Sequence, residues 1–248
     1  MKIGILGTGN IGKTLVIKLS EAGHDVKVAN SRGPESIDAS ILANGAKAET
    51  AEEALNNVEV VILSIPPTSF DKIKEIVAAL PPETVVIDTS NYYPHRDGKI
   101  SALEAGKVQA EWTSEQFNRP VAKAWNAIGA GSFSKKGQNV GHPERLAIPV
   151  AADRQNDRDV ALRLVDETGF DGFDAGPLAE SWRQEPGSPV YCTDLKLSQI
   201  ESALGSAVKE RLPKRRDIVV QAITERTDGE DATVDPDYFV RINRAVYL

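Results

Sequence analysis

Short apolar runs alternate with segments of helical spacing along the first two thirds of the chain. Runs with the length of a strand occur at Lys2–Leu6, Val26–Ala29, Val58–Ile65 and Thr84–Asp88. The third run is almost free of polar residues, which is typical of a strand covered on both faces. The segment after the first run instead repeats its apolar residues at helical spacing. This alternation predicts an α/β fold, Rossmann-like and doubly wound, with a mainly parallel sheet.

The same reasoning assigns the other segments up to Pro177. We expect helices or helical turns at 34–43, 51–55, 69–80, 100–117 and 157–167, and strands at 47–49, 120–126, 146–151 and 170–173. The stretch from Gly129 to Gly141 is rich in Gly, Ser and Lys, which predicts a flexible loop. We therefore expect a first, nucleotide-binding domain at residues 1–177.

The chain changes character after Pro177, and we expect a small helical C-terminal extension over residues 178–248. Its segments are a turn-rich linker at Glu185–Pro189, an ambiguous apolar stretch at 218–224, a loop at 227–231 and a terminal helix at 236–248. Leu197, Ile200 and Leu204 mark one amphipathic helix. Because this apolar face needs a covering surface, we expect a homodimer.

The motif Gly7-Thr8-Gly9-Asn10-Ile11-Gly12 joins the first strand to the first helix. Gly7 permits the tight turn, Gly9 lets the backbone approach a pyrophosphate, and Gly12 lets helix and strand pack closely. The anion would lie at a helix N-terminus, where unpaired N–H groups favour negative charge. The strand before the motif and the helix after it favour a dinucleotide site over a glycine turn needed only for packing.

The end of the second strand indicates which dinucleotide is bound. An NAD site usually has Asp or Glu there for the ribose 2′-hydroxyl, whereas a 2′-phosphate is attracted by Arg. This chain has no acid from Lys27 to Pro34 and offers Asn30, Ser31 and Arg32 instead. We therefore expect NADP(H); the alternative is that Arg32 is a solvated loop residue.

Composition and charge narrow the class of protein. The 248 residues carry a net charge of −7 and a single cysteine, Cys192. These features argue against nucleic acid as a main partner, because phosphate binding needs a basic face, and against an internal disulfide. No apolar run is long enough for a membrane span, and Met1 leads directly into a strand, so we expect no signal peptide and a cytoplasmic protein. No His or Cys grouping has metal-ligand spacing, so we expect no metal.

Candidate proton donors are few. We expect His24 to be structural because it lies in a helix-to-strand turn, while His95 and His142 lie in loops and are candidates for contact with a substrate. Tyr92 and Tyr93 are alternatives, although an aromatic pair in such a loop more often packs or stacks. We assign no catalytic residue.

Five segments together indicate a family. They are Gly7–Gly12, Asn30–Arg32, Ser64–Pro66, Asp88–Asn91 and Val121–Asn126. In order and spacing they resemble the NADP oxidoreductases that depend on coenzyme F420, a deazaflavin. The segment 173–178 is also similar to the cytosolic domain of the related six-transmembrane ferric reductases. The resemblance implies transfer of a hydride between NADPH and a flavin or deazaflavin.

The resemblance also implies a set of cofactor-binding residues. It places Thr8, Gly9, Asn10, Ile11 and Gly12 at the pyrophosphate, Ser31 and Arg32 at the 2′-phosphate, Ser64, Ile65 and Pro66 at the nicotinamide ribose, and Ala124, Trp125 and Asn126 near the nicotinamide. Gly7, Asn30 and Asn91 complete the set. For the segments 64–66 and 123–126 the alternative is ordinary packing at a strand end.

We therefore expect an NADPH-dependent oxidoreductase whose partner is a small-molecule redox acceptor, either coenzyme F420 or a flavin. Two alternatives stay open: an NADPH-dependent reductase of a small carbonyl or imine, and a non-catalytic NADPH-binding sensor. The carbonyl or imine reductase needs a proton donor near the new oxygen or nitrogen, which ring reduction hardly needs. The C-terminal third departs from the compact members of the family, which leaves the second substrate open.

Overall fold

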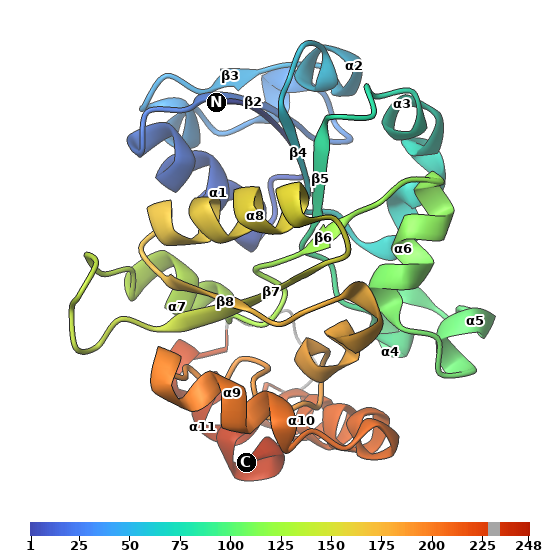
Figure 1. The fold of residues 1–248 in the computed structure, drawn as a ribbon, viewed down its shortest axis with the longest axis vertical. Helices are drawn as coiled ribbons and strands as arrows, with labels where there is room; N and C mark the ends of the chain where they lie inside the picture. The colour runs from blue at the N-terminus through green and yellow to red at the C-terminus, as the bar shows by residue number, and fades with distance from the viewer. Residues whose placement is uncertain (228–233) are drawn as a thin grey trace.

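The computed structural model describes residues 1–227 and 234–248. It contains one sheet with helices on both faces and a group of C-terminal helices at one end of the molecule (Figure 1). The loop expected at 227–231 lies, from residue 228 onward, outside the described residues.

The eight strands have the order β3-β2-β1-β4-β5-β6-β7-β8. Their bounds are β1 Lys2–Leu6, β2 Asp25–Ala29, β3 Lys47–Ala48, β4 Val60–Leu63, β5 Val85–Asp88, β6 Ala122–Lys123, β7 Ala147–Ala152 and β8 Asp171–Asp174. All neighbours run parallel except β6 and β7. Because β2 and β4 lie on opposite sides of β1, the strand order reverses there, as in a doubly wound sheet. The expected Rossmann-like fold class is confirmed.

Helices of different lengths connect the strands. The α-helices are α1 Asn10–Glu21, α2 Ala51–Leu55, α3 Lys74–Ala78, α4 Pro94–Asp97, α5 Ser101–Glu104, α6 Gln109–Phe117, α7 Ala130–Lys135, α8 Gln155–Glu167, α9 Leu197–Gly205, α10 Leu212–Arg226 and α11 Pro236–Tyr247. The 3₁₀ segments are η1 Pro34–Ser36, η2 Ala39–Leu42, η3 Pro67–Lys72, η4 Leu178–Gln184 and η5 Lys209–Arg211.

The two faces of the sheet bury two separate apolar clusters. Strand β4 shows how, because successive side chains of a strand point to opposite faces. Val60 and Ile62 belong to the cluster under α1, α7 and α8, whereas Val61 and Leu63 belong to the cluster under α2, α3 and α6. All four side chains are fully buried. The sequence of β4 has few polar residues because helices cover both faces of this strand.

The C-terminal helices bury a third apolar cluster against the end of the sheet. This cluster joins α9, α10 and α11 to Ala147 of β7 and Phe173 of β8. Ile200 and Leu204 are only 1% and 7% exposed within the single chain. The chain itself therefore covers Ile200 and Leu204, whereas Leu197, the third residue of the expected face, is 46% exposed. The homodimer and the domain boundary near residue 177 stay predictions.

Two of the expected helices are divided in the structure. Segment 34–43 forms η1 and η2, because the Asp38 side chain accepts a hydrogen bond from the Ser40 N–H (2.8 Å) and begins a new turn. Segment 69–80 is divided into η3 and α3 at Ile73, whose φ is −120°. The ambiguous stretch 218–224 lies within α10.

Two further segments differ from expectation. The expected strand at 120–126 pairs only at Ala122 and Lys123, because Trp125 adopts a φ of 55° and leaves the extended conformation. The expected flexible loop at 129–141 contains helix α7, which is anchored by the fully buried Phe133. The turn segment Glu185–Pro189 packs into the body of the molecule, with residues 186–189 buried.

Candidate functional site

A cavity of about 610 Å³ opens where β1, β2 and β4 end. It lies where the strand order reverses, which is where open α/β sheets bind their ligands. Of the predicted cofactor residues, it brings together Gly7, Thr8, Gly9, Asn30, Ser31, Arg32, Ser64, Ile65 and Pro66. Segments far apart in the sequence therefore line one cavity, which we call the nucleotide cavity.

The three motif glycines have different structural roles. A Cβ on Gly7, whose φ is +109°, would lie 2.1 Å from the Ser64 carbonyl oxygen, and a Cβ on Gly12 would lie 2.1 Å from the Gly7 carbonyl oxygen. Packing therefore requires both glycines. Gly9 has an ordinary φ of −66°, and a Cβ there would meet nothing within 4 Å. Packing therefore does not explain Gly9, and the open space beside it leaves its backbone accessible.

Gly9 is also the N-cap of α1, and this helix end is suited to an anion. The helix has no side-chain cap and no acidic residue in its first turn. Its first N–H groups therefore lack intrahelical partners and carry a partial positive charge. Asn10 and Ile11 would offer these groups to a pyrophosphate, while Gly12 is buried against the strand turn.

Asn30 holds the cavity wall together. Its Nδ2 donates to the Thr8 hydroxyl (3.3 Å) and to the Ser36 hydroxyl (3.0 Å). Its Oδ1 accepts a hydrogen bond from the Arg32 N–H (2.8 Å). Asn30 thus connects the glycine turn after β1 to the loop after β2, and it fixes the backbone from which Ser31 and Arg32 project.

Two cations, Arg32 and Lys72, line the nucleotide cavity, and no Asp or Glu among the described residues lines it. Both side chains are exposed. Arg32 follows β2, and Lys72 ends η3, which begins after the end of β4. The two positive charges come from different segments and line the same cavity, which favours an anionic group of a ligand there.

Sequence reasoning missed Lys72 and its neighbour Ser69. No short sequence motif marks these two residues, because they line the cavity only as a result of the conformation of η3. The pair of prolines at the end of β4 is the one local signal, since it stops the strand and starts a new turn there.

Asn91 and Asn126 lie outside the nucleotide cavity but contact each other. The Asn91 amide donates to the Asn126 carbonyl oxygen (2.8 Å), and the Asn126 amide donates to Asn91 Oδ1 (3.2 Å) and to the Gln184 carbonyl oxygen (2.8 Å). The side chain of Gln184 returns a hydrogen bond to Asn126 Oδ1 (2.8 Å). This chain of carboxamides ties the end of β5 to η4.

Ala124 and Trp125 lie in the apolar core. Both are fully buried in the cluster under α1 and α8, and the Trp125 indole donates to the Thr168 hydroxyl (3.3 Å). Neither residue lines the nucleotide cavity. The predicted contact of these residues with the nicotinamide stays a prediction.

A buried ion pair fixes the adjacent strand ends. Lys123 Nζ lies 2.8 Å from Asp88 Oδ2, and both side chains are at most 1% exposed. The Thr113 hydroxyl and the Ser90 N–H also donate to Asp88, at 3.1 Å and 2.8 Å. The pair joins Asp88 of β5 to Lys123 of β6. Separating the two strands would leave a buried charge without its partner, which is strongly unfavourable.

The candidate proton donors are dispersed. His24 contacts the N-terminal amine (3.1 Å) and Glu167 (2.7 Å), which is a structural arrangement. His142 Nδ1 accepts a hydrogen bond from the Glu144 N–H in an exposed turn. The Tyr92 hydroxyl lies within hydrogen-bond distance of two acceptors, the Gly98 carbonyl oxygen (3.1 Å) and Glu104 (2.9 Å). Tyr93 and His95 line a second cavity beside the C-terminal helices. None of these residues lines the nucleotide cavity.

The described residues contain no group of three or more His, Cys, Asp or Glu side chains placed to hold a metal ion. Within 1–227 and 234–248, no helix combines the length and the apolar character that crossing a membrane requires.

Comparison with known proteins supports the family resemblance. Residues 2–92 match the family described as NADP oxidoreductase, coenzyme F420-dependent. This segment carries the glycine motif, the end of β2 and the ends of β4 and β5. The resemblance predicted from the sequence is therefore confirmed over this segment.

Individual relatives resemble different lengths of the chain. The putative protein YjhV of Escherichia coli K12 is 42% identical over 91 residues, which are 37% of this chain and 59% of YjhV. Metalloreductase STEAP3 of Rattus norvegicus is 25% identical over 181 residues, which are 73% of this chain and 35% of STEAP3. The chain thus spans less than two thirds of the length of either relative.

One solved structure covers most of the fold. The hypothetical protein SMa0349 from Sinorhizobium meliloti superimposes with a TM-score of 0.67 at 27% identity, over 79% of this chain and 95% of that protein. The match therefore leaves 21% of the present chain uncovered, the difference between 100% and 79%.

Proposed function

We propose that the protein is an NADP(H)-dependent oxidoreductase that binds its dinucleotide in the nucleotide cavity. The hydride passes between the nicotinamide and a flavin or deazaflavin acceptor, for which coenzyme F420 is the first candidate. The family match over residues 2–92 supports both the cofactor and the acceptor class.

Gly9 is the single observation that carries the proposal. Packing accounts for Gly7 and Gly12, whereas the space beside Gly9 is open. A pyrophosphate at the uncapped N-terminus of α1 would fill that space and accept hydrogen bonds from the first turn. The residues present therefore fit the dinucleotide.

Arg32 and Lys72 support NADP(H) over NAD(H). Both cations line the nucleotide cavity, and no described carboxylate stands there to bond a ribose 2′-hydroxyl. A guanidinium offers two parallel N–H donors to a phosphate, whereas an ammonium acts as a point charge. In our proposal Arg32 orients the 2′-phosphate and Lys72 adds charge.

NADPH supplies the hydride when it is bound, so the protein's task is to bind, orient and exclude water. Ser64, Ile65 and Pro66 form the wall of the cavity that continues from the glycine turn. Asn91 lies beyond it at the end of β5, where the buried Asn126 holds its half-buried side chain by hydrogen bonds. In our proposal Asn91 faces the nicotinamide amide and Asn126 positions Asn91. We assign no protein acid or base to the transfer.

The experiment measures initial rates of NADPH and NADH oxidation for the wild type, Arg32→Ala and Arg163→Ala. Arg163 is an exposed arginine of α8 outside the nucleotide cavity and serves as the matched control. Each protein is assayed with F420, FMN, FAD and a panel of small carbonyls and imines. We expect the KM for NADPH to rise about tenfold to hundredfold in Arg32→Ala, because a charge-assisted hydrogen bond is lost.

The outcomes test the two halves of the proposal separately. Equal use of NADH and NADPH by the wild type, or an unchanged KM in Arg32→Ala, would remove the role of Arg32. Turnover with a carbonyl or imine, but with none of F420, FMN and FAD, would support the proposed cofactor and contradict the proposed acceptor. Tight NADPH binding without oxidation by any acceptor would favour the sensor.

A further inference from the structure

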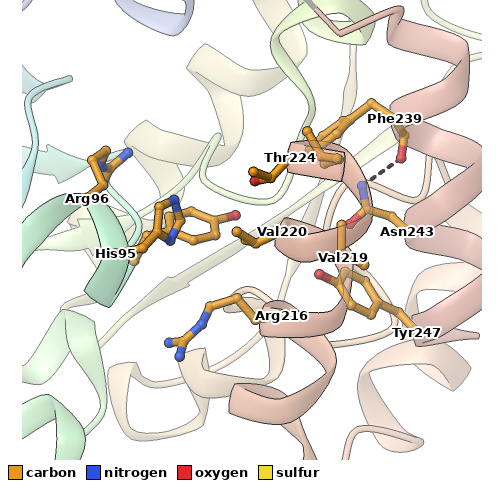
Figure 2. Close-up of a pocket in the computed structure, with 11 residues that line it drawn as sticks. His95, Arg96, Arg216, Val219, Val220, Thr224, Phe239, Asn243 and Tyr247 are labelled. Carbon is orange, nitrogen blue, oxygen red and sulfur yellow. Dashed lines mark hydrogen bonds between the residues drawn. The ribbon is translucent and has the colours of Figure 1, made fainter. Parts of the chain in front are cut away.

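A second cavity, of about 250 Å³, lies between α4 and the C-terminal helices α10 and α11. Figure 2 shows His95 and Arg96 on one side of it and Val219, Val220 and Asn243 on the other. It shares no lining residue with the nucleotide cavity. We call it the helical cavity.

The inner wall of the helical cavity is mostly apolar. Val219 and Tyr247 are each 2% exposed, and Ile223 and Phe239 complete the apolar lining. Asn243 is fully buried among them. Its amide donates to the Phe239 carbonyl oxygen (2.7 Å), one helical turn earlier (Figure 2).

The side-chain oxygen of Asn243 has no hydrogen-bond partner among the described residues. An unpartnered buried acceptor costs about 1–3 kcal/mol, so such atoms are normally satisfied in a folded protein. The Tyr93 hydroxyl, which also lines the cavity, is hydrogen-bonded to the Tyr191 hydroxyl (2.8 Å) and not to Asn243. An N–H or O–H donor of a ligand would satisfy Asn243.

Two cations, Arg96 and Arg216, line the helical cavity, and no carboxylate among the described residues lines it. Each is paired with one carboxylate outside the lining, so only its remaining N–H groups are offered to a ligand. Each guanidinium is oriented by the next residue in the chain, Arg96 by Asp97 (2.7 Å) and Arg216 by Asp217 (2.8 Å). The hydrogen bond of Arg216 uses only Nε, which leaves its terminal N–H groups available.

We propose that the helical cavity binds a small aromatic carboxylate that carries a hydrogen-bond donor at the opposite end. The ring lies against Val219 and Tyr247, the donor bonds Asn243 Oδ1, and the carboxylate faces Arg216 and Arg96. The volume is below the 300–1,000 Å³ or so that is usual for drug-sized ligands, so the ligand is a one-ring molecule. Because the two cavities share no lining residue, this site stands whether or not the nucleotide proposal holds.

Calorimetric titration of the full chain with three probes tests the chemistry without altering the protein. The probes are 4-hydroxybenzoate, benzoate, which lacks the donor, and 4-hydroxybenzyl alcohol, which lacks the charge. We expect benzoate to bind about twofold to tenfold more weakly than 4-hydroxybenzoate, and the alcohol at least about tenfold more weakly.

Two variants and a control then assign the contacts. Arg216→Gln should weaken both benzoates about tenfold and leave the alcohol unchanged, whereas Asn243→Leu should abolish the advantage of 4-hydroxybenzoate over benzoate. Arg211→Gln, an exposed arginine of η5 outside the cavity, should bind all probes as the wild type does.

No heat from any probe at about 10 mM, or equal affinity of wild type for all three, would overturn the proposal, and neither result depends on whether a variant folds. Unchanged affinities in both Arg216→Gln and Asn243→Leu would overturn it as well. Failure of NADPH binding in the Arg32→Ala assay leaves these results unaffected.

Discussion

At the scale of single residues, Gly9 and Gly12 distinguish a glycine required for packing from a glycine proposed to contact the ligand. A Cβ on Gly12 would lie 2.1 Å from a backbone oxygen, whereas a Cβ on Gly9 would meet nothing within 4 Å. Gly12→Ala should therefore destabilise the protein by about 1–3 kcal/mol, the usual range for overpacking. Gly9→Ala should change the free energy of unfolding by less than about 0.5 kcal/mol.

For NADPH binding, Gly9→Ala should be the damaging substitution. The Cβ of Gly9→Ala would fill the space proposed for the pyrophosphate, so we expect the Kd for NADPH to rise at least about tenfold, equivalent to about 1.4 kcal/mol. Urea unfolding measures the first effect, and titration of NADPH fluorescence measures the second. An unchanged NADPH affinity in Gly9→Ala would contradict the proposed contact between Gly9 and the pyrophosphate.

The need for Gly12 could be predicted from the sequence because its contact is local: a Cβ there would meet the Gly7 carbonyl oxygen of the same motif. A Cβ on Gly7 would instead meet the backbone of Ser64, which follows β4. Lys72 could not be predicted, because its place in the nucleotide cavity depends on how η3 turns after β4. The position of Trp125 depends on its φ of 55°, which no pattern of apolar residues encodes.

At the scale of elements, the sequence predicted buried strands well and short helices less well. A continuous apolar run such as β4 has a strong signal, since both faces of the strand are covered. Helix α7 has six residues and lies in a Gly- and Ser-rich stretch, so its composition indicates a loop. What makes it a helix is tertiary: Phe133 is fully buried against Phe170, with ring centroids 5.5 Å apart.

This account of α7 gives a prediction with a control in the same segment. Phe133→Ala should cost about 3–5 kcal/mol, because it leaves a cavity in the core under α1 and α8. Val140→Ala should cost less than about 0.5 kcal/mol, because Val140 is 76% exposed. The midpoints of urea unfolding compare the two variants. Similar, small effects of both would mean that 129–141 behaves as the loop its composition suggests.

At the scale of the whole molecule, the C-terminal helices form part of one packed body. The third apolar cluster includes Tyr191 and Cys192 together with residues of the sheet and of α11. Cys192 is 2% exposed, and burial raises the pKa of its thiol. Because the thiolate is the reactive form, the native protein should react slowly with a thiol reagent. Labelling of Cys192 therefore reports how firmly the C-terminal helices are packed.

Tyr247, near the end of α11, is the residue with which to test that packing. It is 2% exposed, its ring centroid lies 6.5 Å from that of Tyr191, and its carbonyl oxygen accepts a hydrogen bond from Arg215 (3.0 Å). Tyr247→Ala should cost about 3–5 kcal/mol and speed the labelling of Cys192, since removal of the ring opens the cluster. Leu248→Ala is the control, because Leu248 is 63% exposed and should change neither quantity. Rapid labelling of the wild type, or equal labelling of both variants, would mean that the C-terminal helices open independently of the sheet, as a separate unit beyond residue 177 would.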